Sequence, residues 1–338
     1  MNDDTSPALT IAHPAGGVAP SGGARAFIRM RWQPWAQRYG ALGALVVLFV
    51  YNAIDTPFFL TQQSLLFVLL RQAAPVAIVA IGMAIVIGTA GIDLSVGSVM
   101  AISGQVGALA VLSGWGTAPA ILFALAAAAA CGVFNGTLVA RFGVQPIIAT
   151  LILFIAGRGI AQLITGGELQ PLSNSSFQWI GLARPGGVPA QVIVAVIVAV
   201  GAWLLIRTTV FGRYVASVGG NEAAARLAGV PAARVKLLAY VISATLAGLV
   251  GLIVVSANFA SDANNTGLGM ELDAIAAVAV AGTPLTGGRV RIWGSVIGAL
   301  MLKLLQNTLI VHGVAKEIAQ LIEGGVIVAA LYVQRHES

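Results

Sequence analysis

Long, uninterrupted apolar segments run through most of this 338-residue chain and restrict its fold more than any other feature. Hydrophobic residues make up 58% of the chain and charged residues only 9%, whereas soluble domains carry about 25% charged residues. So few charges cannot cover a compact soluble protein, and lipid is the expected solvent. Because the apolar residues do not alternate with polar ones, they predict spanning helices and not a β-barrel.

About ten segments are long enough to span a membrane, since a helix needs ~20 apolar residues to cross ~30 Å of hydrocarbon. They lie near 39–59, 63–88, 96–112, 119–140, 146–165, 190–206, 237–257, 271–285, 292–311 and 317–334. The sequence therefore predicts an all-α polytopic membrane protein with about ten transmembrane helices.

Lys and Arg residues are unevenly distributed over the connections between these segments. With the N-terminus inside, only Arg184 and Lys316 fall outside. The residues that fall inside are Arg25, Arg29, Arg31, Arg38, Arg141, Arg207, Arg213, Arg226, Arg234, Lys236, Arg289, Arg291 and Arg335. Cytoplasmic loops carry an excess of basic residues, so we expect both termini to be cytoplasmic. The formal charge of +6 then reflects topology, and no nucleic-acid partner is expected.

The predicted organisation is a cytoplasmic tail followed by a transmembrane domain. Residues 1–37 are rich in Pro, Gly, Ala, Ser and Arg and predict a disordered basic tail. Residues 38–335 hold the apolar segments. Their cytoplasmic connection 207–236 is the most charged stretch after the tail.

Two pairs of segments indicate an internal repeat. GTAGIDLSVGSVM (88–100) is similar to GTPLTGGRVRIWGSVIGAL (282–300), and NGTLVARFGV (135–144) to NTLIVHGV (307–314). Internal repeats are common in transporters, where the substrate path lies between the halves.

The cytoplasmic connection contains GGNEAAARLAGVP, which predicts a short capped helix. Asn221 is a good N-cap, and Glu222 can pair with Arg226 at i,i+4. Gly229 can adopt the left-handed conformation that ends a helix. Since so short a helix is marginal alone in water, two interpretations stay open: a surface connector and a docking helix for a soluble partner.

The segment GTAGIDLSVGS interrupts two apolar runs with Asp93 and Ser95. Its glycines relax the backbone, and freed backbone groups in a membrane are tolerated only against protein or water. This predicts a broken or re-entrant segment that lines a cavity. The alternative is an ordinary cytoplasmic turn in which Asp93 caps the next helix.

Arg158 lies in the middle of its span, with Gln162 one turn further on the same face. A central Arg is costly in lipid and normally faces a cavity or a carboxylate, so we expect Asp93 or Asp273 as its partner. A structural ion pair and contact with a ligand are both consistent with this. Arg71 is expected to extend toward the membrane surface.

SDANNTGLGMELDAI is the densest polar stretch near the outer side, with Asp262, Asn264, Asn265, Glu271 and Asp273. Amides and carboxylates donate and accept hydrogen bonds in directional pairs, which suits a hydroxyl-rich ligand. An exposed polar loop is the alternative for its first half. It does not explain Glu271 and Asp273, which begin an apolar span.

No motif for catalysis or nucleotide binding is present. The sequence lacks GxxxxGK[ST], HExxH, CxxC and a Ser-His-Asp arrangement, and its three His residues lie far apart. We therefore expect no enzyme activity, no metal and no cofactor in this chain. If ATP drives it, another subunit binds the ATP.

RQAAPVAIVAIGMAIVIGTAGIDLSVGSVMAISG (71–104) resembles the permease subunits of carbohydrate ABC importers of the ribose, xylose and arabinose class. GNEAAARLAGV…YVISATLAGLVG (220–251) is similar to that family's cytoplasmic coupling region. The resemblance extends from about 40 to 334. Within it, 147–168 and 261–278 look most like the galactofuranose-type permease.

The resemblance implies a multi-pass protein of the bacterial inner membrane that imports a monosaccharide, with galactofuranose-like sugars favoured. Two permease chains, identical or sister, would bind cytoplasmic ATPase subunits, and a periplasmic sugar-binding protein would deliver the substrate. The implied coupling residues are Asn221, Glu222, Arg226 and Gly229. The candidate pathway residues are Asp93, Ser95, Arg158, Gln162, Asn264, Asn265 and Asp273.

A self-contained secondary transporter or channel is the main alternative, with Asp93, Arg158 and Asp273 as ion or proton sites. It would need neither a docking helix nor a partner. A polytopic membrane enzyme ranks last, because the sequence has no catalytic constellation.

Overall fold

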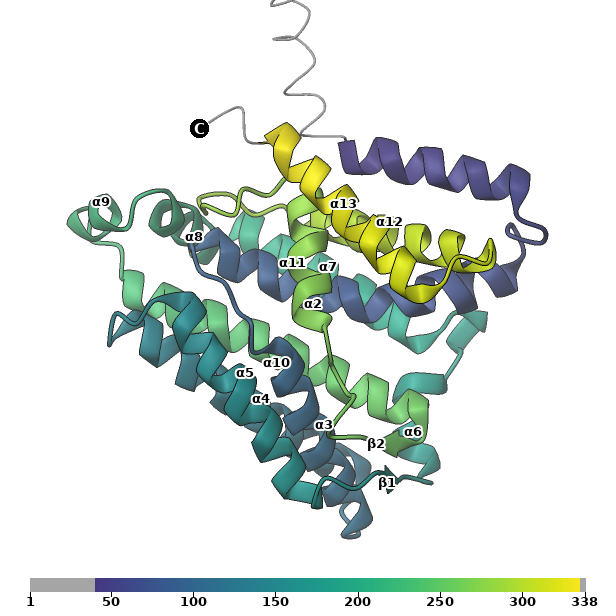
Figure 1. The fold of residues 1–338 in the computed structure, drawn as a ribbon. Coiled ribbons are helices and arrows are strands. Elements are labelled where there is room, and N and C mark those ends of the chain that lie inside the picture. The colour runs from purple at the N-terminus through teal and green to yellow at the C-terminus, as the bar shows by residue number, and fades with distance from the viewer. Residues whose placement is uncertain (1–39, 335–338) are drawn as a thin grey trace, which may run out of the picture. The chain divides into compact units, whose positions relative to one another are not determined.

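The computed structural model describes residues 40–334, and the tail expected over residues 1–37 lies outside them (Figure 1). The described chain is almost entirely helical. After a helix over Gly40–Asp55, its elements are η1 (Gln63–Leu70), α2 (Arg71–Gly88), α3 (Val96–Leu112), α4 (Thr117–Ala140), α5 (Pro146–Thr165), β1 (Gln170–Pro171), α6 (Ser175–Leu182), η2 (Pro185–Gly187), α7 (Ala190–Thr208), α8 (Val210–Gly220), α9 (Glu222–Leu227), α10 (Ala232–Asn258), β2 (Ala260–Ser261), α11 (Met270–Val280), α12 (Ile292–Val311) and α13 (Lys316–Gln334).

The predicted helical class is confirmed. Six described helices are long and apolar enough to cross a membrane: Gln63–Gly88, in which η1 continues into α2, and α4, α5, α7, α10 and α12. The helix Gly40–Asp55 and α3 are apolar but shorter. Large exposed apolar side chains on α4, α5 and α7 form a surface suited to lipid, among them Leu122, Ile155, Leu163 and Ile197.

The segment expected as a span over 271–285 is shorter than its hydropathy indicates. Helix α11 has 11 residues, so it rises ~16 Å, about half the hydrocarbon thickness. It ends near Gly282, whose φ of +74° ends the helical path. The backbone from there to α12 is not helical, so this apolar run is a half-helix followed by a non-helical connection, of which Thr283 is buried.

Helices α2 and α10 form the centre of the bundle. Almost every residue of α2 from Ala73 to Gly88 is buried. Helix α10 packs along α2, α3 and α4, and glycines allow the close approach: a Cβ at Gly132 on α4 would come within 2.6 Å of the Val241 Cα on α10. Small residues at such contacts are typical of helix packing in membranes.

Two breaks in the helices lie side by side. The connection from α2 to α3 is buried at Thr89, Asp93 and Ser95. The Gly288 N–H, in the connection from α11 to α12, donates to the Gly88 carbonyl at 3.1 Å. The first pair of segments with similar sequences, 88–100 and 282–300, are therefore neighbours, while their origin in a repeat stays a prediction.

The two ends of the bundle differ. We call the end that carries α8, α9 and the α4–α5 turn the α9 end, and the end with β1 and β2 the β end (Figure 1). At the β end, Gln170 pairs with Ser261 in a short antiparallel ladder. At the α9 end, basic residues expected in the cytoplasm line one groove, including Arg141, Arg226 and Lys236.

Candidate functional site

Helix α9 has the local structure that its sequence predicts. The Asn221 side chain caps it and accepts a hydrogen bond from the Ala224 N–H at 3.0 Å. The Arg226 guanidinium lies 2.7 Å from the Glu222 carboxylate. Gly229 ends the helix with a φ of +81°, a conformation that glycine adopts without steric strain.

Glu222 also joins α9 to α10, because its second carboxylate oxygen accepts from the Lys236 ammonium. Burial would raise the pKa of the Glu222 carboxyl, but the hydrogen bonds from Lys236 and Arg226 outweigh it and hold that pKa below its ordinary range. Beneath the helix, Ala225 is buried in a cluster with Val215, Val218, Ala232 and Val235. These contacts hold a helix that would be marginal alone.

The outer face of α9 carries an exposed leucine that sequence reasoning missed. Leu227 is 92% exposed, although it ends a helix whose residue Ala225 packs inward. A groove of about 610 Å³ separates α9 from the α4–α5 turn, where Phe142 is also exposed. The signal in the sequence was a leucine two positions after the buried Ala225, on the opposite face of the helix.

Asp93 and Ser95 lie in a closed, buried network. The Asp93 carboxylate accepts from the Ser95 N–H at 3.1 Å, from the Ser95 hydroxyl at 2.7 Å and from the Ser243 hydroxyl on α10 at 3.0 Å. The Asn135 amide on α4 donates to the Ser95 oxygen at 2.8 Å. The segment is a buried break, which Asp93 fixes to α10 and Ser95 fixes to α4.

Arg158 binds backbone carbonyls and not a carboxylate, so the expected partnership with Asp93 or Asp273 is wrong. Its guanidinium donates to the carbonyls of Ala263 at 2.8 Å and Thr266 at 2.7 Å. Carbonyl partners leave no trace in a sequence pattern, because every residue has one. The effect is to fix α5 to the loop that precedes α11.

Gln162 and Asn264 extend the same contact between α5 and this loop. The Gln162 amide donates to the Asn264 side-chain oxygen at 2.8 Å, and the Asn264 amide donates to the Gly167 carbonyl at 3.1 Å. Asn265 instead donates to Asp262 at 2.7 Å, which orders the loop internally. Hydrogen bonds from the Asn265 side chain, and from the N–H groups of Asn264 and Asn265, keep the pKa of the Asp262 carboxyl low.

Asp273 belongs to a third cluster. Its carboxylate lies 2.7 Å from the Lys303 ammonium on α12, which also donates to the Gln306 side chain at 3.1 Å. The seven candidate pathway residues therefore lie in three separate clusters. The largest of these clusters holds Arg158, Gln162, Asn264 and Asn265, on α5 and the loop before α11.

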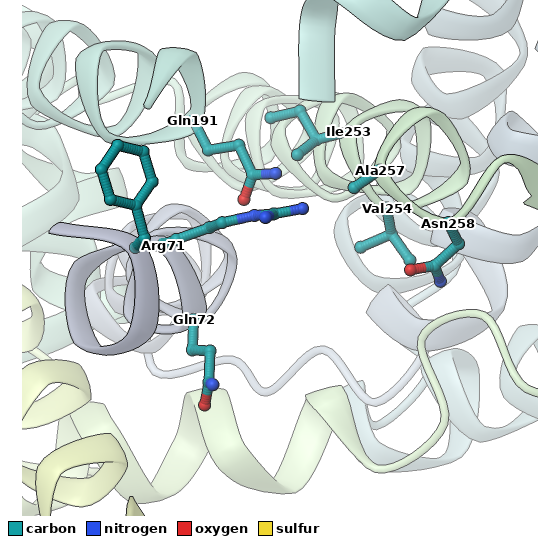
Figure 2. A pocket seen from close by; sticks show the side chains of 8 residues that line it. Arg71, Gln72, Gln191, Ile253, Val254, Ala257 and Asn258 are labelled. Atoms are coloured by element: carbon teal, nitrogen blue, oxygen red, sulfur yellow. The ribbon is translucent and has the colours of Figure 1, made fainter. Parts of the chain in front are cut away.

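A pocket of about 310 Å³ at the β end was not expected from the sequence (Figure 2). Its lining comes from η1, α2, α7 and α10: Phe67, Arg71, Gln72, Gln191, Ile253, Val254, Ala257 and Asn258. Arg71, expected at the membrane surface, instead lines this pocket. Most of the polar lining residues lie far apart in sequence, so no local pattern could group them.

Comparison with known proteins places the chain in a family. A family model described as "Branched-chain amino acid transport system / permease component" matches residues 65–331. The galactofuranose transporter permease protein YtfT of Escherichia coli is 39% identical over 89% of this chain and 90% of its own length. The ribose import permease protein RbsC of the same species is 40% identical, covering 88% of this chain and 94% of its own.

A further relative is the fructose import permease protein FruF of Bifidobacterium longum, 39% identical over 75% of this chain and 72% of its own length. No solved structure matches the chain. Since the family model and these relatives cover most of its length, this chain belongs to the permease-component family of the branched-chain amino acid transport systems and is a multi-pass permease of the bacterial inner membrane.

Proposed function

We propose that this chain is the membrane-spanning permease subunit of an ATP-driven monosaccharide importer, with galactofuranose-like sugars favoured. The observation that carries the proposal is the α9 helix, which is capped, fixed to α10 and leaves Leu227 exposed. Relatives named for galactofuranose, ribose and fructose support the substrate class.

The proposed partners follow from what the chain contains. It has no nucleotide-binding motif, so ATP would be hydrolysed by a separate cytoplasmic subunit that docks on α9 and the adjoining groove. A periplasmic binding protein would deliver the sugar, and a second permease chain would complete the transport path. Asn221, Glu222, Arg226 and Gly229 hold the docking helix in shape.

Movement of the ATPase would reach the membrane through α10. Glu222 binds Lys236 at the start of α10, and Ser243 further along the same helix binds Asp93. Closing the ATPases would thus shift α9, α10 and the buried break before α3 together. In this proposal ATP and the loaded binding protein change the populations of two permease conformations, and Arg158, Gln162, Asn264 and Asn265 lie beside the sugar path.

Uptake into proteoliposomes tests this function. The vesicles hold this chain with and without its ATPase, ATP and binding protein, and the substrates are D-ribose, D-fructose, methyl β-D-galactofuranoside and L-leucine. Sugar uptake only with all components is expected. Uptake by this chain alone, following an ion gradient, would contradict the proposal and favour the secondary transporter, and uptake of leucine in place of sugar would overturn the substrate class.

Docking is tested separately with the substitution Leu227→Asp. We expect it to reduce recovery of the ATPase with this chain by about tenfold, because it places a charge in the centre of the contact. Leu268→Asp is the matched control, since Leu268 is 69% exposed on the loop before α11. Equal recovery with both variants would exclude α9 as the docking helix.

A further inference from the structure

The pocket at the β end lies inside a single permease chain. Asn258 is the last residue of α10 and Gln191 the second residue of α7, so the pocket lies at the ends of these helices. Its volume of about 310 Å³ is at the small end of ligand sites, which span ~300–1,000 Å³. Phe67 belongs to the π-helix η1, an element that often marks functional sites.

Arg71 is a charge without a partner. Figure 2 shows its side chain reaching from α2 across the pocket toward α10. Among residues 40–334 its guanidinium makes no hydrogen bond and no ion pair, and the pocket lining contains no acidic side chain. A guanidinium carries five N–H donors in a fixed fork, so the pocket offers directional donors that the protein itself does not use.

Gln191 offers the complementary group. It is only 3% exposed, and its amide nitrogen is occupied by the Gly181 carbonyl at 2.7 Å. Its amide oxygen accepts no hydrogen bond from the described part of the chain and its side chain lines the pocket, so this oxygen is available to a ligand that donates a hydrogen bond. Sulfate and a phosphate diester only accept hydrogen bonds, so either could pair with Arg71 but would leave the Gln191 oxygen without a donor.

The remaining lining fits a ring with hydroxyl groups on its edge. The side-chain amides of Gln72 and Asn258 each donate and accept, and neither makes a hydrogen bond within the described residues. Ile253, Val254 and Ala257 provide one apolar wall on α10. Hydroxyl groups donate and accept at the same atom, and the C–H face of a sugar ring suits the apolar wall.

We propose that this pocket is a monosaccharide-binding vestibule in the permease itself, with Arg71, Gln72, Gln191 and Asn258 as its hydrogen-bonding groups. The inference rests on the proposed function, because it assigns a binding site to the transported sugar. A zwitterionic amino acid fits less well. Its carboxylate would match Arg71, but its ammonium group would lie in a pocket that already holds a positive charge and has no carboxylate.

Equilibrium binding of radiolabelled D-ribose, D-fructose, methyl β-D-galactofuranoside and L-leucine to the full chain in lipid nanodiscs tests the site. At least one sugar is expected to bind, and Arg71→Gln and Asn258→Leu are each expected to weaken it about tenfold, the usual effect of losing a charged or paired hydrogen bond. Arg207→Gln is the matched control, since Arg207 stacks on Trp203 away from the pocket. Unchanged affinity in both pocket variants, or binding of leucine alone, would overturn the proposal.

Uptake by the complete transporter separates failure of the vestibule from failure of the function. The vestibule is supported if the wild type takes up sugar and Arg71→Gln takes it up with a KM about tenfold higher. Recovery of the ATPase with Arg71→Gln should equal that with the wild type. Sugar uptake with the same KM in wild type and both pocket variants overturns the vestibule and leaves the function standing. Absence of sugar uptake in the wild type with all components present overturns both.

Discussion

Gly132 on α4 shows how one missing side chain sets the distance between two central helices. A Cβ at this position would lie 2.6 Å from the Val241 Cα and 2.7 Å from the Tyr240 carbonyl oxygen on α10. Both are backbone atoms, so the helices would have to separate. We expect Gly132→Ala to lower the free energy of unfolding by about 1–3 kcal/mol, the usual cost of overpacking a core.

Gly201 on α7 provides the matched control for this prediction. A Cβ there meets nothing within 4 Å, so Gly201→Ala is expected to be neutral or to stabilise the helix by about 0.5–1 kcal/mol. Thermal unfolding of both variants in detergent, followed by tryptophan fluorescence, measures the difference. If Gly132→Ala unfolded at the temperature of Gly201→Ala, the close approach of α4 and α10 would be wrong.

His312 joins the end of α12 to the end of the first described helix. Its Nδ1 lies 2.7 Å from the Thr308 carbonyl oxygen and its Nε2 lies 2.7 Å from the Asp55 carboxylate. The Thr308 carbonyl and then Asp55 raise the pKa of the His312 ring above its ordinary value of 6.5. Because the folded pKa lies above the unfolded one, this contact stabilises the fold fully below pH 6.5 and is lost as pH rises through the folded value.

The expected result is a melting temperature that falls slightly as the pH rises above 6.5 in the wild type, and falls less in His312→Gln. The effect is small, since the pair is exposed and screened by solvent. Titration of the His312 ring by NMR, with the resonance assigned from its loss in His312→Gln, measures the pKa directly. A value at or below 6.5 would contradict the contact with Asp55.

Among the elements, α9 depends on its cap because it has only six residues. Replacing an N-cap Asn by Ala costs about 1 kcal/mol, so Asn221→Ala is expected to speed amide exchange in α9 about fivefold and to weaken ATPase docking. Hydrogen–deuterium exchange of the full chain measures this. Asn174→Ala is the control, because Asn174 caps α6 in the same way, accepting from the Phe177 N–H at 3.0 Å.

In Asn174→Ala we expect faster exchange in α6, with α9 and ATPase docking unchanged. If both variants affected docking equally, docking would reflect general stability and not the cap of α9.

The sequence predicted those elements whose determining contacts are local. Asn221, Glu222 and Gly229 shape α9 through residues a few positions away, so their roles in the helix could be derived from the order of residues alone. The helix bounds followed from continuous apolarity. The length of helix α11 was overestimated because hydropathy carries no information on backbone conformation. The positive φ of Gly282 ends the helix inside an apolar run.

Contacts between distant segments could not be predicted. Arg158 binds two backbone carbonyls and Asp273 binds Lys303, and neither choice follows from the spacing of polar residues. The vestibule was missed for the same reason, since Gln72, Gln191 and Asn258 lie on three helices and each is unremarkable in its own segment.

At the scale of the whole molecule, α10 connects the two ends of the transport machinery. It begins beside α9 and contacts α2, α3, α4 and α6 along its length. Its Ser243 hydroxyl donates to the Asp93 carboxylate, which also accepts from the Ser95 hydroxyl. The Ser95 oxygen in turn accepts from the Asn135 amide on α4. A displacement of α9 would therefore reach the buried break before α3 through hydrogen bonds between closely packed helices.

This connection predicts that Asp93→Asn uncouples ATP hydrolysis from transport. The neutral amide is a weaker acceptor for the Ser95 and Ser243 hydroxyls and adds a donor to a closed network. Helix α9 and its docking surface lie away from this network and are not changed by the substitution. We expect the ratio of sugar taken up to ATP hydrolysed to fall about tenfold, which corresponds to about 1.4 kcal/mol, with ATPase recovery unchanged. Glu317→Gln, at an exposed position in the first turn of α13, should leave the ratio within about twofold of wild type. Loss of ATPase recovery in Asp93→Asn, or an unchanged ratio, would mean that the break before α3 does not take part in coupling.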